Sequence, residues 1–318
     1  MSLLGTHLAP LTTPIQAAWL HTLDPFVVEF PEAFPIPGLR WYGTAYLLGF
    51  VAGYFLIRRV VTAGKSPLTS DRVIDFVIAC IFGVLVGGRL GYVMFYDPSL
   101  WERIDEPPYW GVLAINRGGM ASHGGMIGGL LGCAWFAYRQ KLPRLHLLDL
   151  LAFACPAGLF FGRIANFING ELWGRTVDAS FALAVRFPQE TLTGPELSRL
   201  RAGDSEMIAL AEQLTPARHP SQLYAAALEG LAVFAALLWF YRKPVKPGVL
   251  AAWFALSYAP MRIVNEFFRE PDTRIGFDAL GLTRGQWLSV VLFVAGLILL
   301  RFATTRPVEP LGGWWRAE

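Results

Sequence analysis

Seven stretches of mainly apolar residues alternate with shorter polar segments along this 318-residue chain. A helix needs roughly 20 such residues to cross the hydrocarbon core of a bilayer, and it tolerates glycine, proline and an occasional polar residue. The pattern therefore predicts an all-α polytopic membrane protein with about seven transmembrane helices. They fall near residues 42–61, 73–95, 120–138, 147–162, 220–241, 249–267 and 286–304.

Two of these stretches leave a second interpretation open. The third begins with the glycine-rich run from Gly118 to Gly125, and the fourth is short and contains Pro156. Glycine and proline in a membrane helix free backbone groups that the surrounding protein must then satisfy. Either stretch could therefore be a broken or re-entrant segment.

Composition and charge agree with a membrane location. Hydrophobic residues make up 54% of the chain and charged residues only 16%, whereas an average soluble domain is roughly a quarter charged. Basic residues collect after the first, third, fifth and seventh stretches, and most acidic residues lie in the other connections. By the positive-inside rule, this pattern predicts an N-terminus outside and a C-terminus inside the cytoplasm.

Three segments lie outside the predicted membrane domain core. Residues 1–40 show no removable signal peptide and are expected to form an extracytoplasmic arm, and residues 305–318 a cytoplasmic tail. The membrane domain, 41–304, contains a polar insertion at about 176–218. A strand-like run at 181–187 and a helical run at 196–214 predict that this insertion is a small extracytoplasmic α+β cap. It is too short to bury a core of its own.

The densest group of polar residues directly follows the fourth stretch. It runs from Gly162 to Arg175 and contains Arg163, Asn166, Asn169, Glu171 and Arg175. Ionisable groups cost roughly 2.5 to 3.5 kcal/mol each near a bilayer centre, so they need a polar partner or a ligand there. The segment therefore predicts an intramembrane polar site.

Two further candidates lie between small residues near the outer ends of their predicted helices. His123 can accept a proton near neutral pH, although a histidine bonded to a backbone carbonyl in a tight helix crossing would give the same pattern. Arg89 carries a planar guanidinium suited to phosphate or carboxylate, although an arginine that only reaches towards the membrane interface is equally compatible.

Arg262, Glu266 and Arg269 recur at intervals of four and three residues and therefore share one helical face. Salt bridges among them would satisfy their charges without a ligand. The two arginines outnumber the glutamate, however, which leaves positive charge for an anion. Together with Arg89 and the arginines after the fourth stretch, they favour a site for an anionic lipid headgroup.

The three cysteines, Cys80, Cys133 and Cys155, all fall inside predicted spans. No histidine lies at ligand spacing from them, so they predict helix packing and neither a metal site nor a nucleophile. No metal or other cofactor is expected.

These motifs together resemble the prolipoprotein diacylglyceryl transferase family of bacterial inner-membrane enzymes. The likeness follows the order of the family from Trp41-Tyr42-Gly43 to Pro271-Asp272. The motifs that carry it are Gly88 to Tyr92, Gly119 to Gly125, Gly162 to Arg175, His219 to Tyr224 and Glu266 to Asp272.

The resemblance implies transfer of the diacylglyceryl group of phosphatidylglycerol to the lipobox cysteine thiol of a preprolipoprotein signal peptide, with release of glycerol phosphate. It also implies an active site on the extracytoplasmic side of a multi-pass protein of the bacterial inner membrane. The family's histidine falls on His123, interpreted as the base that takes the thiol proton. Its main phosphate contacts fall on Arg163 and Arg262, and these three residues are the catalytic candidates.

The same resemblance, together with the polar inventory above, supplies a set of substrate-binding candidates. They are Tyr42, Arg89, Asn166, Asn169, Glu171, Arg175, Tyr224, Glu266 and Arg269.

The chain departs from the family pattern at Ala225, where glutamate is usual. The next carboxylate is Glu229, an isolated acidic group inside the fifth stretch, which implies a partner or protonation. Either the missing glutamate is dispensable or Glu229 covers part of its role. A paralogue with weakened activity therefore stays open, as does a transporter or flippase for an anionic lipid. The lack of repeated halves speaks against the transporter.

Overall fold

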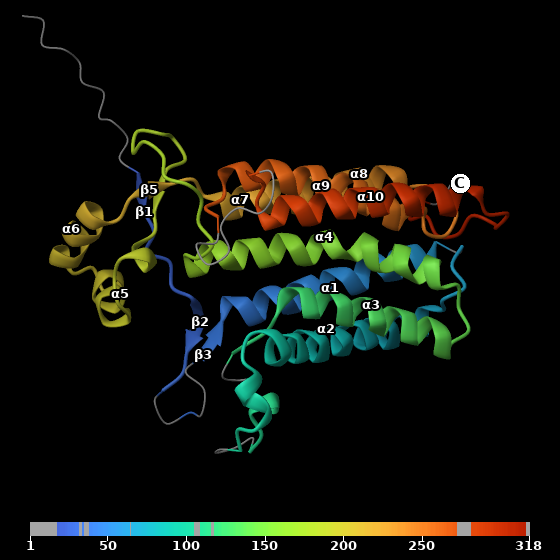
Figure 1. Cartoon of the computed structure of the whole chain (residues 1–318), viewed down its shortest axis with the longest axis horizontal. Coiled ribbons are helices and arrows are strands. Elements are labelled where there is room, and N and C mark those ends of the chain that lie inside the picture. The colour runs from blue at the N-terminus through green and yellow to red at the C-terminus, as the bar shows by residue number, and fades with distance from the viewer. Residues whose placement is uncertain are drawn as a thin grey trace, which may run out of the picture.

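Long helices lie side by side along most of the molecule (Figure 1). The computed structural model describes residues 18–31, 34, 38–63, 65–104, 109–115, 118–271 and 281–315. Its long helices are α1 (Trp41–Thr62), α2 (Val73–Phe95), α3 (Ser122–Arg139), α4 (Arg144–Asn169), α9 (Val249–Phe268) and α10 (Arg284–Thr305). A further helical stretch joins α7 (Ser221–Ala225), the π-helical segment η6 (Ala226–Ala232) and α8 (Val233–Phe240).

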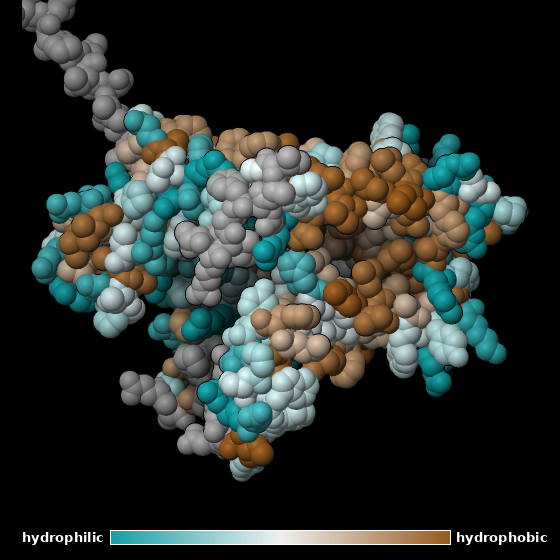
Figure 2. Space-filling view, viewed as in Figure 1, coloured by the Kyte–Doolittle hydropathy of each residue, from teal (hydrophilic) through white to brown (hydrophobic). Residues whose placement is uncertain are grey.

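Five helical segments in the described part of the chain are long and apolar enough to cross a membrane. They are Trp41–Thr62, Ser70–Phe95, Arg144–Asn169, Ser221–Phe240 and Arg284–Thr305. Only 17 to 39% of the residues in their apolar windows are buried inside the protein, so most of these residues keep some accessible surface. Figure 2 shows this apolar surface around the middle of the bundle. Because a soluble protein rarely exposes so large an apolar surface, the chain is a multi-pass membrane protein.

The other two predicted spans also form continuous helices. α3 has 18 residues and α9 has 20, but glycines in α3 and ionisable residues in α9 lower their hydropathy. The glycine run from Gly118 does not break α3, because the helix begins at Ser122 after the two left-handed residues Gly118 and Gly119.

The glycines of α3 serve close packing against α2. A Cβ atom on Gly83 or Gly87 of α2 would overlap the backbone of Gly128 or Gly124 of α3, and the reverse substitutions meet the same obstacle. Small residues permit this approach in membrane helices. The backbones of α2 and α3 are therefore in direct contact at these glycines.

The fourth predicted span is longer than expected and is unbroken. α4 runs for 26 residues from Arg144 to Asn169 with Pro156 inside it, so the broken or re-entrant alternative was wrong. The helix lies between α1, α3, α8 and α9. A proline is tolerated in such a position because neighbouring helices can satisfy the freed backbone groups.

A small mixed unit lies at the end of the bundle where α4 ends (Figure 1). Strand β1 (Trp19–Leu20) pairs parallel with β4 (Val185–Arg186), which pairs antiparallel with β5 (Ala217–Arg218). The predicted strand at 181–187 is thus only two residues long. The predicted helix at 196–214 is two helices, α5 (Gly194–Arg201) and α6 (Ser205–Leu214), because Gly203 in a left-handed conformation turns the chain between them.

The termini extend the two ends of the bundle. Within the predicted arm, β2 (Phe26–Glu29) and β3 (Gly38–Arg40) form an antiparallel hairpin that leads into α1; residues 1–17 lie outside the described residues. At the opposite end, Leu311 pairs with Val245, and the Trp314 indole donates to the Leu238 carbonyl at 2.8 Å.

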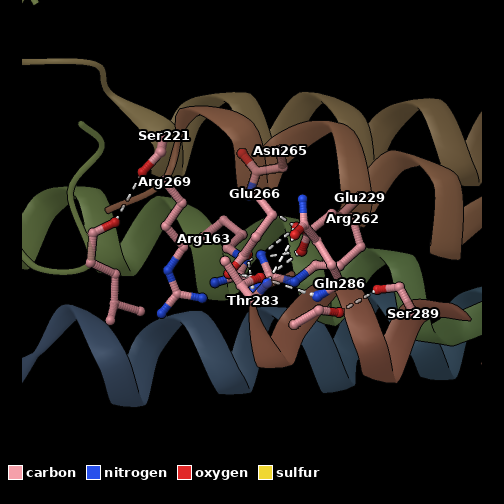
Figure 3. A network of polar contacts seen from close by, with 12 residues as sticks. Arg163, Ser221, Glu229, Arg262, Asn265, Glu266, Arg269, Thr283, Gln286 and Ser289 are labelled. Atoms are coloured by element: carbon pink, nitrogen blue, oxygen red, sulfur yellow. Dashed lines mark hydrogen bonds and ion pairs between the residues drawn. The ribbon is translucent and has the colours of Figure 1, made fainter. Parts of the chain in front are cut away.

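The insertion, expected to be too short for a core of its own, does bury a small apolar cluster of Leu192, Leu200, Met207 and Ala211, against which Leu20 of β1 packs. A larger apolar cluster fills the end of the bundle away from this unit, with members such as Phe76, Phe136 and Phe153. The buried charged network, in contrast, lies among α4, η6 and α9 (Figure 3).

Candidate active site

A buried carboxylate, Glu229, lies at the centre of the charged network. Its side chain is completely buried in the π-helical segment η6. Arg163 of α4 donates to Oε2 at 2.8 Å, and Arg262 of α9 donates to Oε1 at 3.0 Å. Asn265 donates to Oε1 at 3.1 Å. Glu229 therefore holds two arginines from different helices at fixed positions, as Figure 3 shows.

A second carboxylate continues the network towards α10. Glu266 forms an ion pair with Arg262, Nη2 to Oε2, at 2.8 Å. The Thr283 hydroxyl donates to Glu266 Oε1 at 3.1 Å, and Thr283 also caps the first turn of α10 with Gln286. The predicted salt bridge between Arg262 and Glu266 is thus present.

Arg269 brings a third positive charge to the same region. It follows the last residue of α9, is partly buried, and lies within electrostatic range of Arg262, Glu266 and Arg163. Figure 3 shows its side chain extending beside Arg163. Among the described residues its guanidinium has no hydrogen-bond partner. Three arginines face two glutamates here, so the described part of the network carries an excess of one positive charge.

Three polar side chains form a second cluster where α1 meets α4. The Tyr42 hydroxyl donates to Glu171 Oε1 and accepts from Asn166 Nδ2. Asn166 also donates to Glu171 Oε1 at 2.8 Å. Close by, at the end of α4, the Asn169 Oδ1 atom is buried without a partner in the described part of the chain. This atom is a hydrogen-bond acceptor for which the described residues provide no donor.

The loop from Gly170 to Arg175 is held by backbone contacts to two other elements. Gly170 ends α4 in a left-handed conformation. Gln222 donates to the Glu171 carbonyl at 2.7 Å, and Ser221 to the Leu172 carbonyl at 3.0 Å. The Arg175 amide then donates to the Phe268 carbonyl at 2.8 Å. The long sequence motif therefore joins the beginning of α7 to the end of α9.

Arg218 of the mixed unit connects this unit to the loop from Gly170 to Arg175 by hydrogen bonds. Its guanidinium donates to both carboxylate oxygens of Glu190 at 2.6 Å, to the Gly174 carbonyl at 2.9 Å, and to Glu270 at 3.2 Å. A two-pronged arginine–carboxylate contact of this kind is stronger and more directional than a single hydrogen bond. Sequence reasoning did not single out Arg218, because nothing in the sequence reveals that Glu190 and Glu270 meet it.

Arg89 has a different setting from the one expected of a substrate-binding residue. Its side chain is buried and donates to four backbone carbonyls, those of Gly111, Val112, Gly118 and Gly119. All its donor atoms are thereby engaged. The residue fixes the segment that leads into α3.

The remaining candidates lie around the network and not within it. His123 is exposed in the first turn of α3, and its side chain forms no hydrogen bond or ion pair with a described charged residue. Tyr224 on α7 contacts His219 through its hydroxyl at 3.2 Å and packs on Phe268. Arg175 is exposed and donates to the Arg269 carbonyl at 3.2 Å.

Glu229, Asn265 and Thr283 are members of the network that the candidate residues above omit. Glu229 had a usable signal, namely an isolated carboxylate inside an apolar run. Asn265 and Thr283 had none, because Glu229 and Glu266, the carboxylates that they contact, lie 36 and 17 residues away in the sequence. Ala225 is buried, so a glutamate there would add a second buried charge near the one already present.

An apolar cavity of about 290 Å³ lies beside the polar clusters, between α1 and α4. Its wall includes Trp41, Leu48, Phe161 and Ile164. Two of these residues, Trp41 and Ile164, directly adjoin Tyr42 and Arg163 in the sequence. The cavity therefore lies at the same level of α1 and α4 as Tyr42 and Arg163.

Comparison with known proteins agrees with the motifs. The sequence model of the prolipoprotein diacylglyceryl transferase family matches residues 31–302. A phosphatidylglycerol–prolipoprotein diacylglyceryl transferase of Bdellovibrio bacteriovorus is 42% identical over 94% of this chain and 98% of its own length. Enzymes of the same name from Bradyrhizobium diazoefficiens and Neisseria gonorrhoeae are 37% and 40% identical, over 90% and 87% of this chain and 99% and 95% of their own lengths. The chain belongs to the prolipoprotein diacylglyceryl transferase family.

Proposed function

We propose that this protein transfers the diacylglyceryl group of phosphatidylglycerol to the lipobox cysteine of prolipoproteins, the first step of bacterial lipoprotein maturation. The observation that carries this proposal is the group formed by the buried Arg262 and the partly buried Arg163 and Arg269 around the buried Glu229 and Glu266. Its excess of one positive charge matches the single negative charge of a phosphodiester.

The reaction explains why arginines are needed. The cysteine sulfur attacks a glycerol carbon, forms the C–S bond of a thioether, and breaks the bond between that carbon and a phosphate oxygen. The phosphodiester monoanion thereby becomes glycerol phosphate with a second negative charge. Donors aimed at the leaving oxygen stabilise this growing charge most in the transition state.

Each arginine has a separate role in this proposal. Arg163 and Arg262 are positioned by Glu229 and contact the phosphate, while Arg269 contributes guanidinium donors that have no partner among the described residues. Glu266 orients Arg262, since the two form an ion pair at 2.8 Å.

The cluster of Tyr42, Asn166 and Glu171 receives the glycerol end of the headgroup, and the Asn169 oxygen accepts a hydroxyl there. Tyr224 and Arg175 border the site beside Phe268 and Arg269. The apolar cavity between α1 and α4 accommodates part of an acyl chain.

His123 is proposed as the base that removes the thiol proton. A free cysteine is only a few per cent thiolate at pH 7, so a base raises the reactive population. His123 has no side-chain partner within the described part of the chain, which leaves the imidazole available to a peptide. The peptide cysteine would lie between His123 and the arginines, and the proton passes from sulfur to the imidazole.

The membrane arrangement follows from the same proposal. All seven long helical stretches cross the inner membrane, with the N-terminus outside and the C-terminus in the cytoplasm. The mixed unit of β1, β4, β5, α5 and α6 is then an extracytoplasmic cap beside the active site. The lipobox signal peptide approaches on this side.

The proposal is tested by mass spectrometry of a lipobox peptide incubated with the purified protein and phosphatidylglycerol. We expect a mass gain of one diacylglyceryl group on the cysteine peptide and none on a peptide with serine in its place. Arg163→Gln and His123→Ala should abolish the gain, while Arg58→Gln at the opposite end of α1 should retain it. No gain with the native protein under conditions in which it binds the lipid would refute the transferase and favour lipid transport.

A further inference from the structure

A second cavity, lined by cationic residues, lies at the opposite end of the bundle from the charged network, where α3 turns into α4. It has a volume of about 410 Å³ and is lined by Ala137, Tyr138, Arg139, Lys141, Leu142 and Arg144. Three of these six residues are cationic and none is acidic. Neither the reaction above nor the family motifs involve any of them.

The backbone holds the three cations in a defined turn. α3 ends with the Leu142 amide donating to the Ala137 carbonyl at 2.9 Å and the Lys141 amide donating to the Tyr138 carbonyl at 3.3 Å. Lys141 takes the left-handed conformation, φ +54°, that glycine usually supplies at this place. α4 then begins at Arg144 only three residues later. The turn thus brings Arg139, Lys141 and Arg144 to one cavity.

The charges of this cavity are not neutralised by the described protein. Arg139, Lys141 and Arg144 are exposed, and none has an ion pair with a described carboxylate. The first turn of α4 has no side-chain cap. Unpaired cations around a hollow attract a phosphate group more strongly than a flat basic surface does, because several donors converge on one ligand.

The surface next to the cavity is apolar and exposed. Leu131, Trp135 and Tyr138 are 64%, 58% and 67% exposed, and their spacing of four and three residues places them on one face of α3. This face runs from the cavity along the bundle. A ligand with a charged head and an apolar tail therefore fits better than a soluble anion.

We propose that the cavity at the α3–α4 turn binds the phosphate headgroup of an anionic phospholipid, whose acyl chain lies along Leu131 and Trp135. This lipid is bound at the end of the bundle that lacks the cap, so it is not the lipid consumed by the reaction. The basic residues after the third apolar stretch also fit the positive-inside rule. The positive-inside rule accounts for basic residues in this loop, but it does not account for a cavity lined by them.

The test compares two triple variants of the full-length protein that remove the same charge. The first, Arg139→Gln/Lys141→Asn/Arg144→Gln, empties the cavity of cations; asparagine is used at position 141 because it tolerates the left-handed conformation. The control, Arg58→Gln/Arg59→Gln/Lys65→Gln, removes three exposed cations at the end of α1 and just after it. Native mass spectrometry would measure the binding of phosphatidic acid and of phosphatidylcholine with identical acyl chains.

We expect the native protein and the control variant each to bind one more phosphatidic acid molecule than the cavity variant binds. The affinity of this additional site for phosphatidic acid should be about tenfold higher in the native protein and the control than in the cavity variant. Phosphatidylcholine should not distinguish the three proteins. All three proteins retain Arg163, Arg262 and Arg269. Any phosphatidic acid bound at these arginines therefore contributes equally to the three measurements.

Equal loss of phosphatidic acid in both variants, or no loss in the cavity variant, would overturn the proposal. A competition experiment with inorganic phosphate distinguishes a lipid site from a site for a soluble anion. If it displaces phosphatidic acid from the native protein at equal concentration, the cavity takes a soluble anion and the lipid assignment is wrong.

Discussion

Glu229 shows how a single buried carboxylate organises two cations from separate helices. Replacing Glu229 by glutamine keeps the side-chain shape but leaves Arg163 and Arg262 without their shared negative charge. Breaking a buried ion pair in this way costs about 3 kcal/mol, because the remaining charges stay desolvated. We therefore expect a fall of several degrees in the thermal midpoint of Glu229→Gln in detergent. The exposed Glu212→Gln should leave the midpoint unchanged, and an equal midpoint for both variants would contradict this role.

Arg89 supports a different residue-scale prediction. A lysine at position 89 has three donors on a point charge and cannot reach four carbonyls in two directions. We expect Arg89→Lys to lower kcat at least tenfold through displacement of the segment before His123, with KM for phosphatidylglycerol within about twofold of the native value. The kinetics are measured by thioether formation. A raised KM with unchanged kcat would instead mean that Arg89 contacts the lipid.

For individual residues, the sequence predicts which residue types belong to the polar site better than it predicts which residues they contact. Arg163, Arg262 and Glu266 were expected at a polar site and meet there. The setting of Arg89 was not predictable, because the carbonyls that it contacts belong to Val112 and three glycines, all more than twenty residues away, and leave no mark on the sequence. The same limit applies to Asn265, which bonds Glu229 across two helices.

The helix pair α2–α3 carries the clearest prediction at the scale of elements. A Cβ atom at Gly128 would overlap the Gly83 carbonyl, whereas one at Gly158 of α4 meets nothing within 4 Å. We expect Gly128→Ala to destabilise the protein by about 2 kcal/mol through overpacking. Gly158→Ala should be neutral or stabilising by up to about 1 kcal/mol, since alanine favours a helix. Chemical denaturation in detergent would compare them, and an unchanged stability in Gly128→Ala would refute the close contact.

The hydropathy pattern predicted where the helices lie, but not whether a helix is continuous or contains a π-helical segment. The continuous α4 was underestimated because Pro156 reads as a breaker, although packing on four neighbours preserves the helix. The fifth apolar stretch gave no sign of the π-helical segment at 226–232, since it is apolar on nearly every side and has no periodicity to disturb. Such segments occur often at functional sites, and this one carries Glu229.

At the scale of the whole molecule, the N-terminal arm is tied to the membrane part through His21. Its Nε2 atom contacts the Phe167 carbonyl at 2.8 Å, and Gln189 donates to Nδ1 at 3.0 Å. This pattern suits the neutral imidazole. Burial lowers the pKa of His21 from its usual 6.5 to about 4.

The lowered pKa predicts a pH dependence for the docking of the arm. Its contribution is complete above pH 6.5, the ordinary pKa, and is lost as the pH falls from 6.5 towards 4, up to about 3 kcal/mol. Hydrogen-exchange protection of the Trp19 and His21 amides, which bond Ala184 and Arg186, should fall across this range. His21→Gln should flatten the profile. Protection that is constant from pH 7 to 4.5 in the native protein would contradict the prediction.

The measurement that tests the central claim most directly is the ratio of glycerol phosphate released to thioether formed. Both products would be quantified by mass spectrometry in one reaction of the native protein with phosphatidylglycerol and a lipobox peptide, beside Arg262→Gln. We predict one glycerol phosphate per thioether and a parallel loss of both in the variant. Glycerol phosphate without thioether, or thioether formation that persists in Arg262→Gln at the native rate, would contradict the assignment of the arginines to the leaving phosphate.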